Sequence, residues 1–485
     1  MASDALSPAL RGPTLLRRPL EVGVFLAALV TVAVARAPST VLDDPDTHWH
    51  VRIGRDILAS GVLPRVDSYS HTFAGERWIA KEWLAQIVLA LVHDAAGPTG
   101  LVFLTLACLA GTVAGIFLWL ARRFDTRLAL VVAVLVLLFL QPQALARPHI
   151  LAYPLLALWL GGLVDALRAG RTPPLALALL PGLWANLHAS APIALAFAVP
   201  LGLEAVLRAA PAARTRTAMT WGAFGLVALL AAFATPYGLG TAGVAAALLN
   251  DREATLYIQE WRRMSLDGFG FLALATGLLA AAAVACAPRA AVWRAAIVLL
   301  AGIMMVTHVR FMGHFAVAAA IVLADPVAER FAALRAAGGP EARGFGRLGG
   351  VALAVLLAAL VAITASRPAP GAAITPERAL AAAREAGLAR PVLNDYNFGG
   401  FLLARGVPTF IDGRTDQLFV GGFMHALERA LSEQQPDALL AILARHDVTW
   451  ALVETDGSAA RLLRRSPGWR VIHEDPVATV LAREG

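Results

Sequence analysis

Apolar runs close to the length of a membrane-spanning helix recur along most of this chain. A helix needs about 20 consecutive apolar residues to cross the hydrocarbon core of a bilayer. Of the 485 residues, 58% are hydrophobic and only 15% are charged, which is more apolar surface than a water-soluble fold can bury. The sequence therefore predicts a polytopic α-helical membrane protein.

The apolar runs predict about eleven transmembrane helices, several of them short at ~16 residues. They cover residues 20–36, 100–121, 127–142, 149–168, 174–190, 191–208, 218–236, 269–287, 293–308, 311–325 and 348–366. A further apolar stretch, 83–92, is too short to cross the bilayer. We expect it to lie at the membrane surface as an amphipathic helix.

The arginines predict the orientation of these helices, because cytoplasmic loops carry an excess of basic residues. If 83–92 does not cross, one side of the membrane receives Arg17, Arg18, Arg122, Arg123, Arg127, Arg168, Arg171, Arg208, Arg214, Arg216, Arg289, Arg294, Arg330, Arg335, Arg343 and Arg347. That side is predicted to be the cytoplasm of a bacterium, and it holds residues 1–19. This topology also explains the net charge of +7, so no nucleic-acid partner is expected.

The same topology divides the chain into domains. Residues 20–366 form the transmembrane domain, with a first periplasmic loop at 37–99, and residues 367–485 lie in the periplasm. Short strand-like stretches mark this last segment at 391–395, 408–412, 449–454, 469–474 and 478–482. Helix-like stretches lie between or beside them, at 376–388, 423–431, 436–446 and 457–465. The segment is therefore predicted to be a small α/β domain.

The unusual polar residues of the membrane domain gather in the loops on the predicted outer face. They are Asp43, Asp44, Asp46, His48, Trp49, His50, Arg147, His149, Trp184, Asn186, His188, Glu260, Trp261, His308, Arg310 and His314. Each has an ordinary structural interpretation when taken alone, such as a histidine at a helix end or a tryptophan at the membrane interface. Ionisable groups in or near a membrane are costly, so their gathering on one face predicts a functional site.

The acidic sequence Asp43-Asp44-Pro45-Asp46 is the strongest local signal. Helix capping, with Pro45 as the first helical residue, explains one aspartate but not three. Two carboxylates spaced as Asp44 and Asp46 are able to hold a divalent cation, or to divide the roles of base and orienting group. Glu82 is a further carboxylate in the same predicted outer loop.

The first loop resembles that of a bacterial group within the GT-C superfamily of polyprenyl-phosphate-dependent glycosyltransferases. The matching residues are Asp44, Asp46, Trp49, His50, Gly54, Ile57, Pro64, Asp67, Ser70, Glu82, Trp83 and Leu84. Similar pieces follow at 146–150, 186–188, 235–238, 260–261 and 308–311, and in the tail at 394–402 and 410–414. The resemblance covers nearly the whole chain and implies a GT-C-like membrane domain with interfacial helices in its first loop.

The resemblance also implies a function, namely transfer of a hexosyl or pentosyl group from a polyprenyl-phosphate carrier to a glycan, lipid or protein acceptor at the periplasmic face of the inner membrane. A first-loop carboxylate would act as general base, with Asp44, Asp46 and Glu82 as candidates. The leaving phosphate needs cationic or hydrogen-bonding partners, for which we name Arg147, His149, His188, His308 and Arg310. Mg²⁺ or Mn²⁺ on Asp44 and Asp46 is an alternative source of positive charge.

Further residues are predicted to contact the substrates. They are His48, His50, Asn186, Glu260, Asp395, Tyr396, Asp412 and Arg414. The tail residues among them have turn chemistry as an equally good explanation.

Three other function classes remain open. A transporter would place charges near the middle of the membrane and show internal repeats, which this chain does not. A polysaccharide polymerase or ligase would rely on arginine and histidine rather than on an acidic first loop. A non-catalytic assembly protein would tolerate loss of both Asp44 and Asp46.

Overall fold

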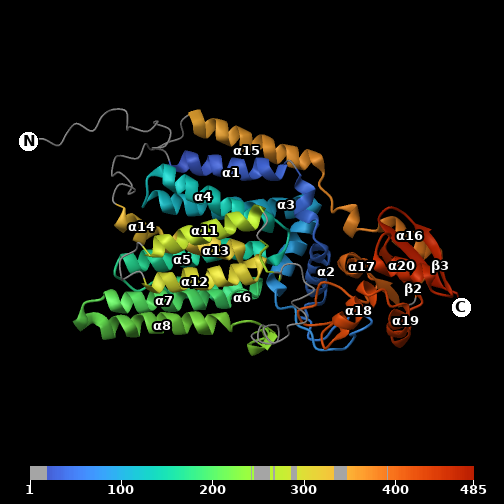
Figure 1. The fold of residues 1–485 in the computed structure, drawn as a ribbon. Coiled ribbons are helices and arrows are strands. Elements are labelled where there is room, and N and C mark those ends of the chain that lie inside the picture. The colour runs from blue at the N-terminus through green and yellow to red at the C-terminus, as the bar shows by residue number, and fades with distance from the viewer. Residues whose placement is uncertain are drawn as a thin grey trace, which may run out of the picture.

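A helical bundle with a small α/β domain at one end makes up the computed structural model (Figure 1). The structure describes residues 19–35, 37–241, 243–244, 261, 263–265, 268–285, 292–331, 347–389 and 391–484. The bundle consists of α1 (Pro19–Ala35), α3 (Trp83–Ala121), α4 (Thr126–Leu140), α5 (Ala152–Arg168), α6 (Leu180–Leu187), α7 (Pro192–Arg208), α8 (Arg214–Ala232), α11 (Gly268–Ala285), α12 (Val292–Thr307), α13 (Met312–Val322), α14 (Ala324–Arg330) and α15 (Arg347–Ser366). We call the end that carries the α/β domain the domain-side end, and the opposite one the far end.

Each range predicted to span the membrane is mostly helical where the structure describes it. Within the described residues, four helices are long and apolar enough to cross a membrane: Trp83–Ala121, Thr126–Gln143, Pro148–Arg168 and Gly349–Ser366. The pair Val309–Val322 and Ala324–Arg330, bent by 42°, would make a fifth. The predicted number of about eleven is therefore not confirmed, because most of the other helices are shorter than a full crossing requires.

The bundle surface is apolar where it faces outward. Leu158, Val199 and Val361 are each more than 60% exposed on different helices. A water-soluble domain scatters such residues singly, whereas here they recur on most helices of the bundle, as expected for contact with lipid.

The second predicted span, 100–121, continues backwards into the stretch 83–92, which we expected to lie at the membrane surface. Residues 83–121 form the single helix α3, but Gly97 breaks it with φ 60° and ψ −157°, and Pro98 follows. Proline removes a backbone donor and glycine permits the unusual dihedrals. The stretch 83–92 and the span 100–121 thus lie on either side of a break.

Helix α2 (Pro45–Ser60) lies across the domain-side end of the bundle (Figure 1). The helix begins where the capping signals in the sequence predict. Asp44 is the N-cap and accepts a hydrogen bond from the backbone N–H of Asp46 at 2.8 Å. Pro45 is the first helical residue. Its end is set by Gly61, which adopts a left-handed conformation with φ 68°. One side of α2 packs on α3 and another on α17 (Tyr396–Ala404) of the C-terminal domain.

The C-terminal domain contains a four-stranded sheet in the order β1-β2-β4-β3. Its strands are β1 (Val392–Asn394), β2 (Trp450–Glu454), β3 (Trp469–Glu474) and β4 (Ala478–Arg483), and only the β1–β2 pair is parallel. The helices are α16 (Glu377–Glu385), α17, α18 (Phe423–Ser432), α19 (Pro436–Arg445) and α20 (Ser458–Arg465). The α/β prediction is thus confirmed, with two local errors: α17 was not predicted, and the stretch 408–412 is not a strand but a loop with one bridge from Thr409 to Ser70.

Candidate functional site

Arg147 joins the two carboxylates of the acidic motif. Its Nη1 lies 3.2 Å from Asp44 Oδ2, and its Nη2 lies 2.6 Å from Asp46 Oδ2. The other oxygen of Asp46 accepts a hydrogen bond from Trp49 Nε1 at 2.8 Å. Arg147 directly precedes the short 3-10 helix Pro148–Leu151 that leads into α5, so the first loop and the bundle meet through a charge-assisted fork.

The acidic motif and Arg147 do not suit a metal ion in this arrangement. The guanidinium occupies the space between Asp44 and Asp46 where a cation would bind. Among the described residues, no group of three or more histidine, cysteine, aspartate or glutamate side chains is placed to hold a metal. A site for Mg²⁺ or Mn²⁺ therefore remains only a prediction.

His50 lies on the buried side of α2, one helical turn after Asp46. Its ring stacks on Trp49 with centroids 3.6 Å apart, and its Nδ1 is 3.4 Å from Gln86 Nε2. Burial lowers the pKa of His50 well below its ordinary value, and the positive charge of Arg147 acts in the same direction. The imidazole is therefore neutral at physiological pH and is suited to hydrogen bonding rather than to holding an anion by charge.

Glu82 and His188 form a second pair beside the first. Glu82 Oε1 lies 3.5 Å from His188 Nε2, and His188 Nδ1 lies 2.7 Å from Ser190 Oγ. The neighbouring residues are also joined, because Trp83 Nε1 donates to Asn186 Oδ1 at 2.7 Å. The start of α3 is thus fixed to the turn between α6 and α7 by two adjacent polar contacts.

Lys81 connects these two pairs to the C-terminal domain. It forms an ion pair with Asp416 of that domain. Burial lowers the pKa of Lys81; Glu82 and Asp46 oppose this shift, and the nearby positive charges of Arg310 and Arg147 add to it. These interactions gather cationic and anionic groups from the first loop, two loops of the bundle and the C-terminal domain at one place.

A row of aromatic and imidazole rings leads from this place into the bundle. The centroids of His188 and His149 are 6.3 Å apart, those of His149 and Tyr153 are 6.0 Å apart, and those of Tyr153 and His314 are 5.4 Å apart. His149 Nε2 contacts the backbone oxygen of Gln143 at 2.9 Å. His314 is only 3% exposed, and within the described part of the chain neither of its ring nitrogens has a hydrogen-bond partner.

His308 and Arg310 lie at the edge of the cluster, near Trp261. The Arg310 guanidinium is 4.7 Å from the Trp261 ring, and the His308 ring is 4.9 Å from it. These two of the five predicted phosphate ligands therefore lie on the turn between α12 and α13. Glu260, which we also predicted to contact substrate, lies outside the described residues.

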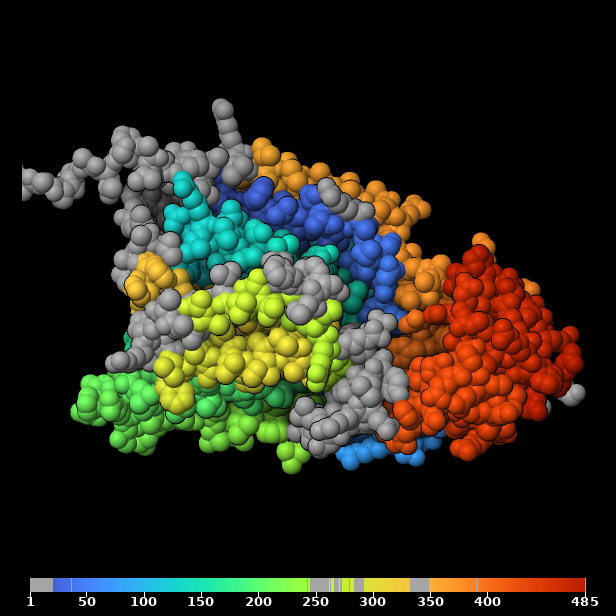
Figure 2. Space-filling view, in the orientation of Figure 1, coloured from blue at the N-terminus to red at the C-terminus, as the bar shows by residue number. Residues whose placement is uncertain are grey.

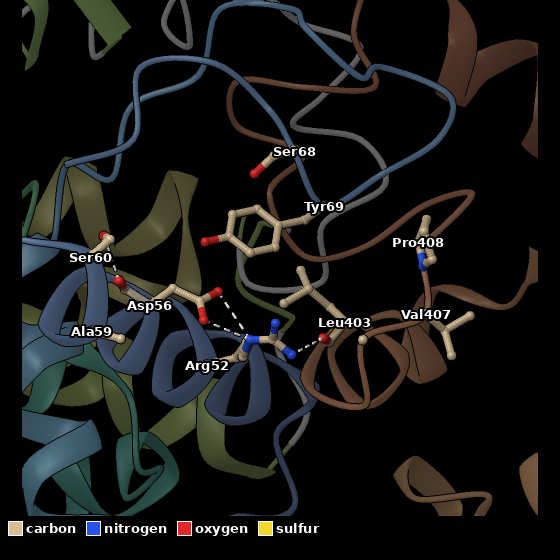
Figure 3. Close-up of a pocket in the computed structure, with 10 residues that line it drawn as sticks. Arg52, Asp56, Ala59, Ser60, Ser68, Tyr69, Leu403, Val407 and Pro408 are labelled. Carbon is tan, nitrogen blue, oxygen red and sulfur yellow. Dashed lines mark hydrogen bonds and ion pairs between the residues drawn. The ribbon is translucent and has the colours of Figure 1, made fainter. Parts of the chain in front are cut away.

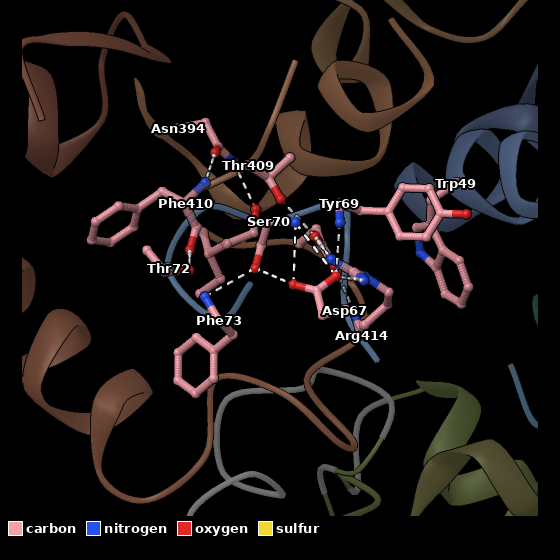
Figure 4. Close-up of polar contacts among 12 residues, drawn as sticks. Trp49, Asp67, Tyr69, Ser70, Thr72, Phe73, Asn394, Thr409, Phe410 and Arg414 are labelled. Atoms are coloured by element: carbon pink, nitrogen blue, oxygen red, sulfur yellow. Dashed lines mark hydrogen bonds and ion pairs between the residues drawn. The ribbon is translucent and has the colours of Figure 1, made fainter. Parts of the chain in front are cut away.

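Asp412 and Arg414 are far more buried than a substrate contact requires. Arg414 donates two hydrogen bonds to Asp412, from Nε at 2.8 Å and from Nη2 at 2.7 Å, and forms a third contact with Asp67 of the first loop. All three side chains have an exposed fraction of 0%. Figure 4 shows Asp67 and Arg414 together with Ser70 and Thr409. In this structure the cluster binds the C-terminal domain to the first loop, and contact with an acceptor stays a prediction.

The remaining predicted substrate contacts interact with, or belong to, the C-terminal domain. His48 faces α17, with its ring 6.2 Å from that of Phe401, and burial lowers its pKa to about 4. Asp395 caps the start of α17 and accepts a hydrogen bond from the backbone N–H of Glu454. Tyr396 is the first residue of α17 and packs against the core of the domain.

Two cavities open near this end of the molecule. The first, of about 540 Å³, lies between α2, the first loop and the end of α17; Figure 3 shows Arg52, Asp56, Tyr69 and Leu403 in its wall. The second, of about 560 Å³, has mostly apolar walls from α3, α6 and the end of α8. Trp83 and Asn186 line the second cavity, which places it directly beside the Glu82–His188 pair.

Sequence reasoning left out three residues that the structure brings into this arrangement. Lys81 is the only lysine of the chain, and this rarity could have marked it as a candidate site residue. His314 was noted on the outer face but given no role. Gly413 lies in the tail piece 410–414 that carries the resemblance but was given no role, because only the folded chain shows its contact with Asp46.

Comparison with known proteins supports the fold. Neither a known family profile nor a curated protein sequence matches the chain. Among solved structures, ArnT from Cupriavidus metallidurans in the apo state is similar at 15% identity with a TM-score of 0.51, covering 94% of this chain and 97% of that one. The structure of ArnT from the same organism bound to undecaprenyl phosphate covers the same shares at 14% identity and a TM-score of 0.48. The chain thus has an ArnT-like fold over nearly its whole length.

Proposed function

We propose that this protein is a glycosyltransferase of the bacterial inner membrane that moves a sugar from a polyprenyl-phosphate carrier to an acceptor at the periplasmic face. One observation carries the proposal: Arg147 bridges Asp44 and Asp46 at the domain-side end, within reach of Lys81 and Glu82. The ArnT-like fold and the first-loop resemblance to the GT-C superfamily support the same function. In this proposal the N-terminus is cytoplasmic and the C-terminal domain periplasmic.

The donor would bind with its prenyl chain in the apolar cavity and its phosphate at the basic groups. The cavity is bordered by Trp83 and Asn186 and opens at the bundle surface, where a lipid chain is available. Arg147, Lys81 and Arg310 then lie near enough to neutralise a phosphate. Arginine suits this role because its planar fork matches two phosphate oxygens.

The proposed reaction needs a base and a stabilised leaving group. As the acceptor oxygen attacks the anomeric carbon, its proton passes to a carboxylate, for which we choose Asp46. The bond between the anomeric carbon and the phosphate oxygen breaks, and the electron pair leaves with polyprenyl phosphate. The basic groups named above stabilise that charge.

The contacts of Arg147 suggest why Asp46 is the base rather than Asp44. Both aspartates contact Arg147, but Asp44 is also engaged as the helix cap by the backbone N–H of Asp46, whereas the other oxygen of Asp46 is held by the Trp49 side chain. A donor phosphate competes with Asp46 for that guanidinium. When Arg147 turns toward the phosphate, Asp46 loses its positive neighbour and becomes a stronger base.

The test measures release of polyprenyl phosphate from a panel of polyprenyl-phosphate sugars by the purified full-length protein in detergent. Asp46→Asn should lower kcat about 100-fold or more in protein that still purifies folded, whereas Asp44→Asn, which can still cap α2, should keep most of the turnover. Asp94→Asn is the matched control, because that exposed aspartate pairs, among the described residues, with Arg55 and His93 and not with a residue of the acidic motif. Parallel assays with EDTA decide whether a metal ion takes part.

Two results would count against the proposal. Wild-type protein that releases nothing from any donor in the panel would favour a polymerase, ligase or assembly protein. Unchanged turnover in Asp46→Asn would remove Asp46 from the role of base.

A further inference from the structure

Three glycines of the C-terminal part of the chain lie against three residues of the acidic motif. The backbone N–H of Gly371 donates to Asp43 Oδ1 at 2.7 Å. A methyl group added to Gly400 would lie 2.0 Å from the backbone oxygen of Pro45, and one added to Gly413 would lie 1.7 Å from Asp46 Oδ1. Carbon and oxygen atoms cannot approach so closely. Backbone without a side chain is therefore required at Gly400 and Gly413 as the structure stands.

Gly413 has the most specific surroundings of the three. The added methyl group would also lie 2.8 Å from Trp49 Nε1, the donor that holds Asp46 Oδ1. The backbone of Gly413 thus covers the hydrogen bond from Trp49 Nε1 to Asp46 Oδ1, the carboxylate oxygen that does not face Arg147 Nη2. Gly413 has no positive φ, so the close approach and not an unusual backbone conformation accounts for glycine here.

The turn that carries Gly413 is fixed on both sides. Before and after it, Asp412 and Arg414 belong to the fully buried cluster with Asp67. Further along, Asp416 pairs with Lys81. Gln417 then makes two hydrogen bonds with the backbone of Ile79, accepting at 3.1 Å and donating at 3.0 Å. Segment 412–417 is therefore attached to the first loop at three points around the acidic motif.

We infer that segment 412–417 is a positioning element of the active site, and that Gly413 holds the Asp46 carboxylate in its orientation toward Trp49 and Arg147. The inference rests on the proposed function for its catalytic consequence. The C-terminal domain is then not a separate binding module but a part of the active site that the same chain supplies. Gly413 touches no reacting atom, so it is a positioning residue.

A double-mutant cycle tests the contact without any assay of activity. Gly413→Ala should lower the melting temperature of the purified full-length protein by several degrees. The same change should have a smaller effect in an Asp46→Ala background, because the Asp46 atoms at 1.7 and 2.7 Å from the methyl group are then gone and Trp49 Nε1, at 2.8 Å, loses its hydrogen bond to Asp46 Oδ1. Gly225→Ala on α8 is the control, since a methyl group there meets nothing within 4 Å. Equal losses in the two backgrounds would overturn the inference.

The catalytic consequence has its own readout. Gly413→Ala should lower kcat for donor turnover about 100-fold with little change in KM, because displacement of a catalytic group by about 1 Å has an effect of that size. Its pH–rate profile should also shift, as the carboxylate loses its fixed partners. Wild-type kcat and profile in Gly413→Ala would contradict a positioning role. Coupling in the stability cycle, together with no turnover by the wild type, would overturn the proposed function and leave the contact established.

Discussion

Asp395 gives the protein a pH-dependent stability that can be predicted from one residue. Burial raises the pKa of its carboxyl group to about 7, with the backbone N–H of Glu454 opposing the shift. In the unfolded chain the group ionises near pH 4. Between pH 4 and pH 7 the folded state therefore binds more protons than the unfolded state, and stability falls as the pH rises through this interval.

Asp395→Asn should remove this dependence. We expect the variant to gain on the order of a few kcal/mol over the wild type at pH 8, since each unit of pKa shift corresponds to about 1.4 kcal/mol, and little at pH 4, measured as melting temperature across the pH series. Asp456→Asn, at an exposed position of the same domain, should show no such trend. A constant difference between Asp395→Asn and wild type at all pH values would refute the prediction.

At the level of single residues, the sequence predicted the role of a residue within its own segment better than it predicted which distant residue it contacts. The capping role of Asp44 was one of the stated alternatives, since the signals for a helix start lie within three residues of each other. Its partner Arg147 lies 103 residues further along, and no local pattern connects the two. The sequence placed Arg147 on the same face as the acidic motif but did not reveal its contact with two carboxylates; its role as a phosphate ligand stays a prediction.

Among the elements, helices with long apolar runs were predicted well, whereas a short helix that contains two glycines was missed. Helix α17 was missed because Gly399 and Gly400 lie in its middle and lower its helix propensity. Tertiary contact explains both glycines: a methyl group on Gly399 would lie 2.4 Å from the backbone oxygen of Ile411, and one on Gly400 would meet Pro45. The packing of α17 on its neighbours overrode the local preference.

The break within α3 leads to a prediction at the same scale. Gly97 has φ 60° and ψ −157°, a region that is essentially open to glycine alone and costs other residues about 1–3 kcal/mol. Gly97→Ala should therefore destabilise the protein by about that amount, although a methyl group there would meet no atom within 4 Å. Gly111→Ala on the same helix should be neutral or slightly stabilising, because it has ordinary dihedrals and open space. Equal melting temperatures for the two variants would show that α3 can straighten.

At the scale of the whole molecule, charged groups gather at both ends of the bundle but in different ways. At the domain-side end they lie around cavities and loops, as described for the candidate site. At the far end they form a packed network that joins α3, α5, α7, α12 and α14, made up of Arg123, Asp165, Arg168, Glu204, Arg208, Arg294 and Asp325. Within it, Arg294 is 0% exposed and pairs with Glu204 at 2.9 Å. Figure 2 shows the C-terminal domain well removed from the end of the bundle where α7 and α8 meet.

This difference predicts that the two ends respond differently to mutation. Arg294→Met should cost about 3 kcal/mol or more, because it removes a partner from the buried Glu204. The double variant Arg294→Met/Glu204→Met should recover most of that loss, since it replaces both charges by apolar groups. The double variant should keep the wild-type kcat for donor turnover, because neither residue lies at the domain-side end. Melting temperatures measure the change in stability, and turnover measured on the same preparations shows whether kcat is kept. A stable double variant with strongly reduced turnover would mean that the far-end network influences the site, and that the bundle does more than hold it in place.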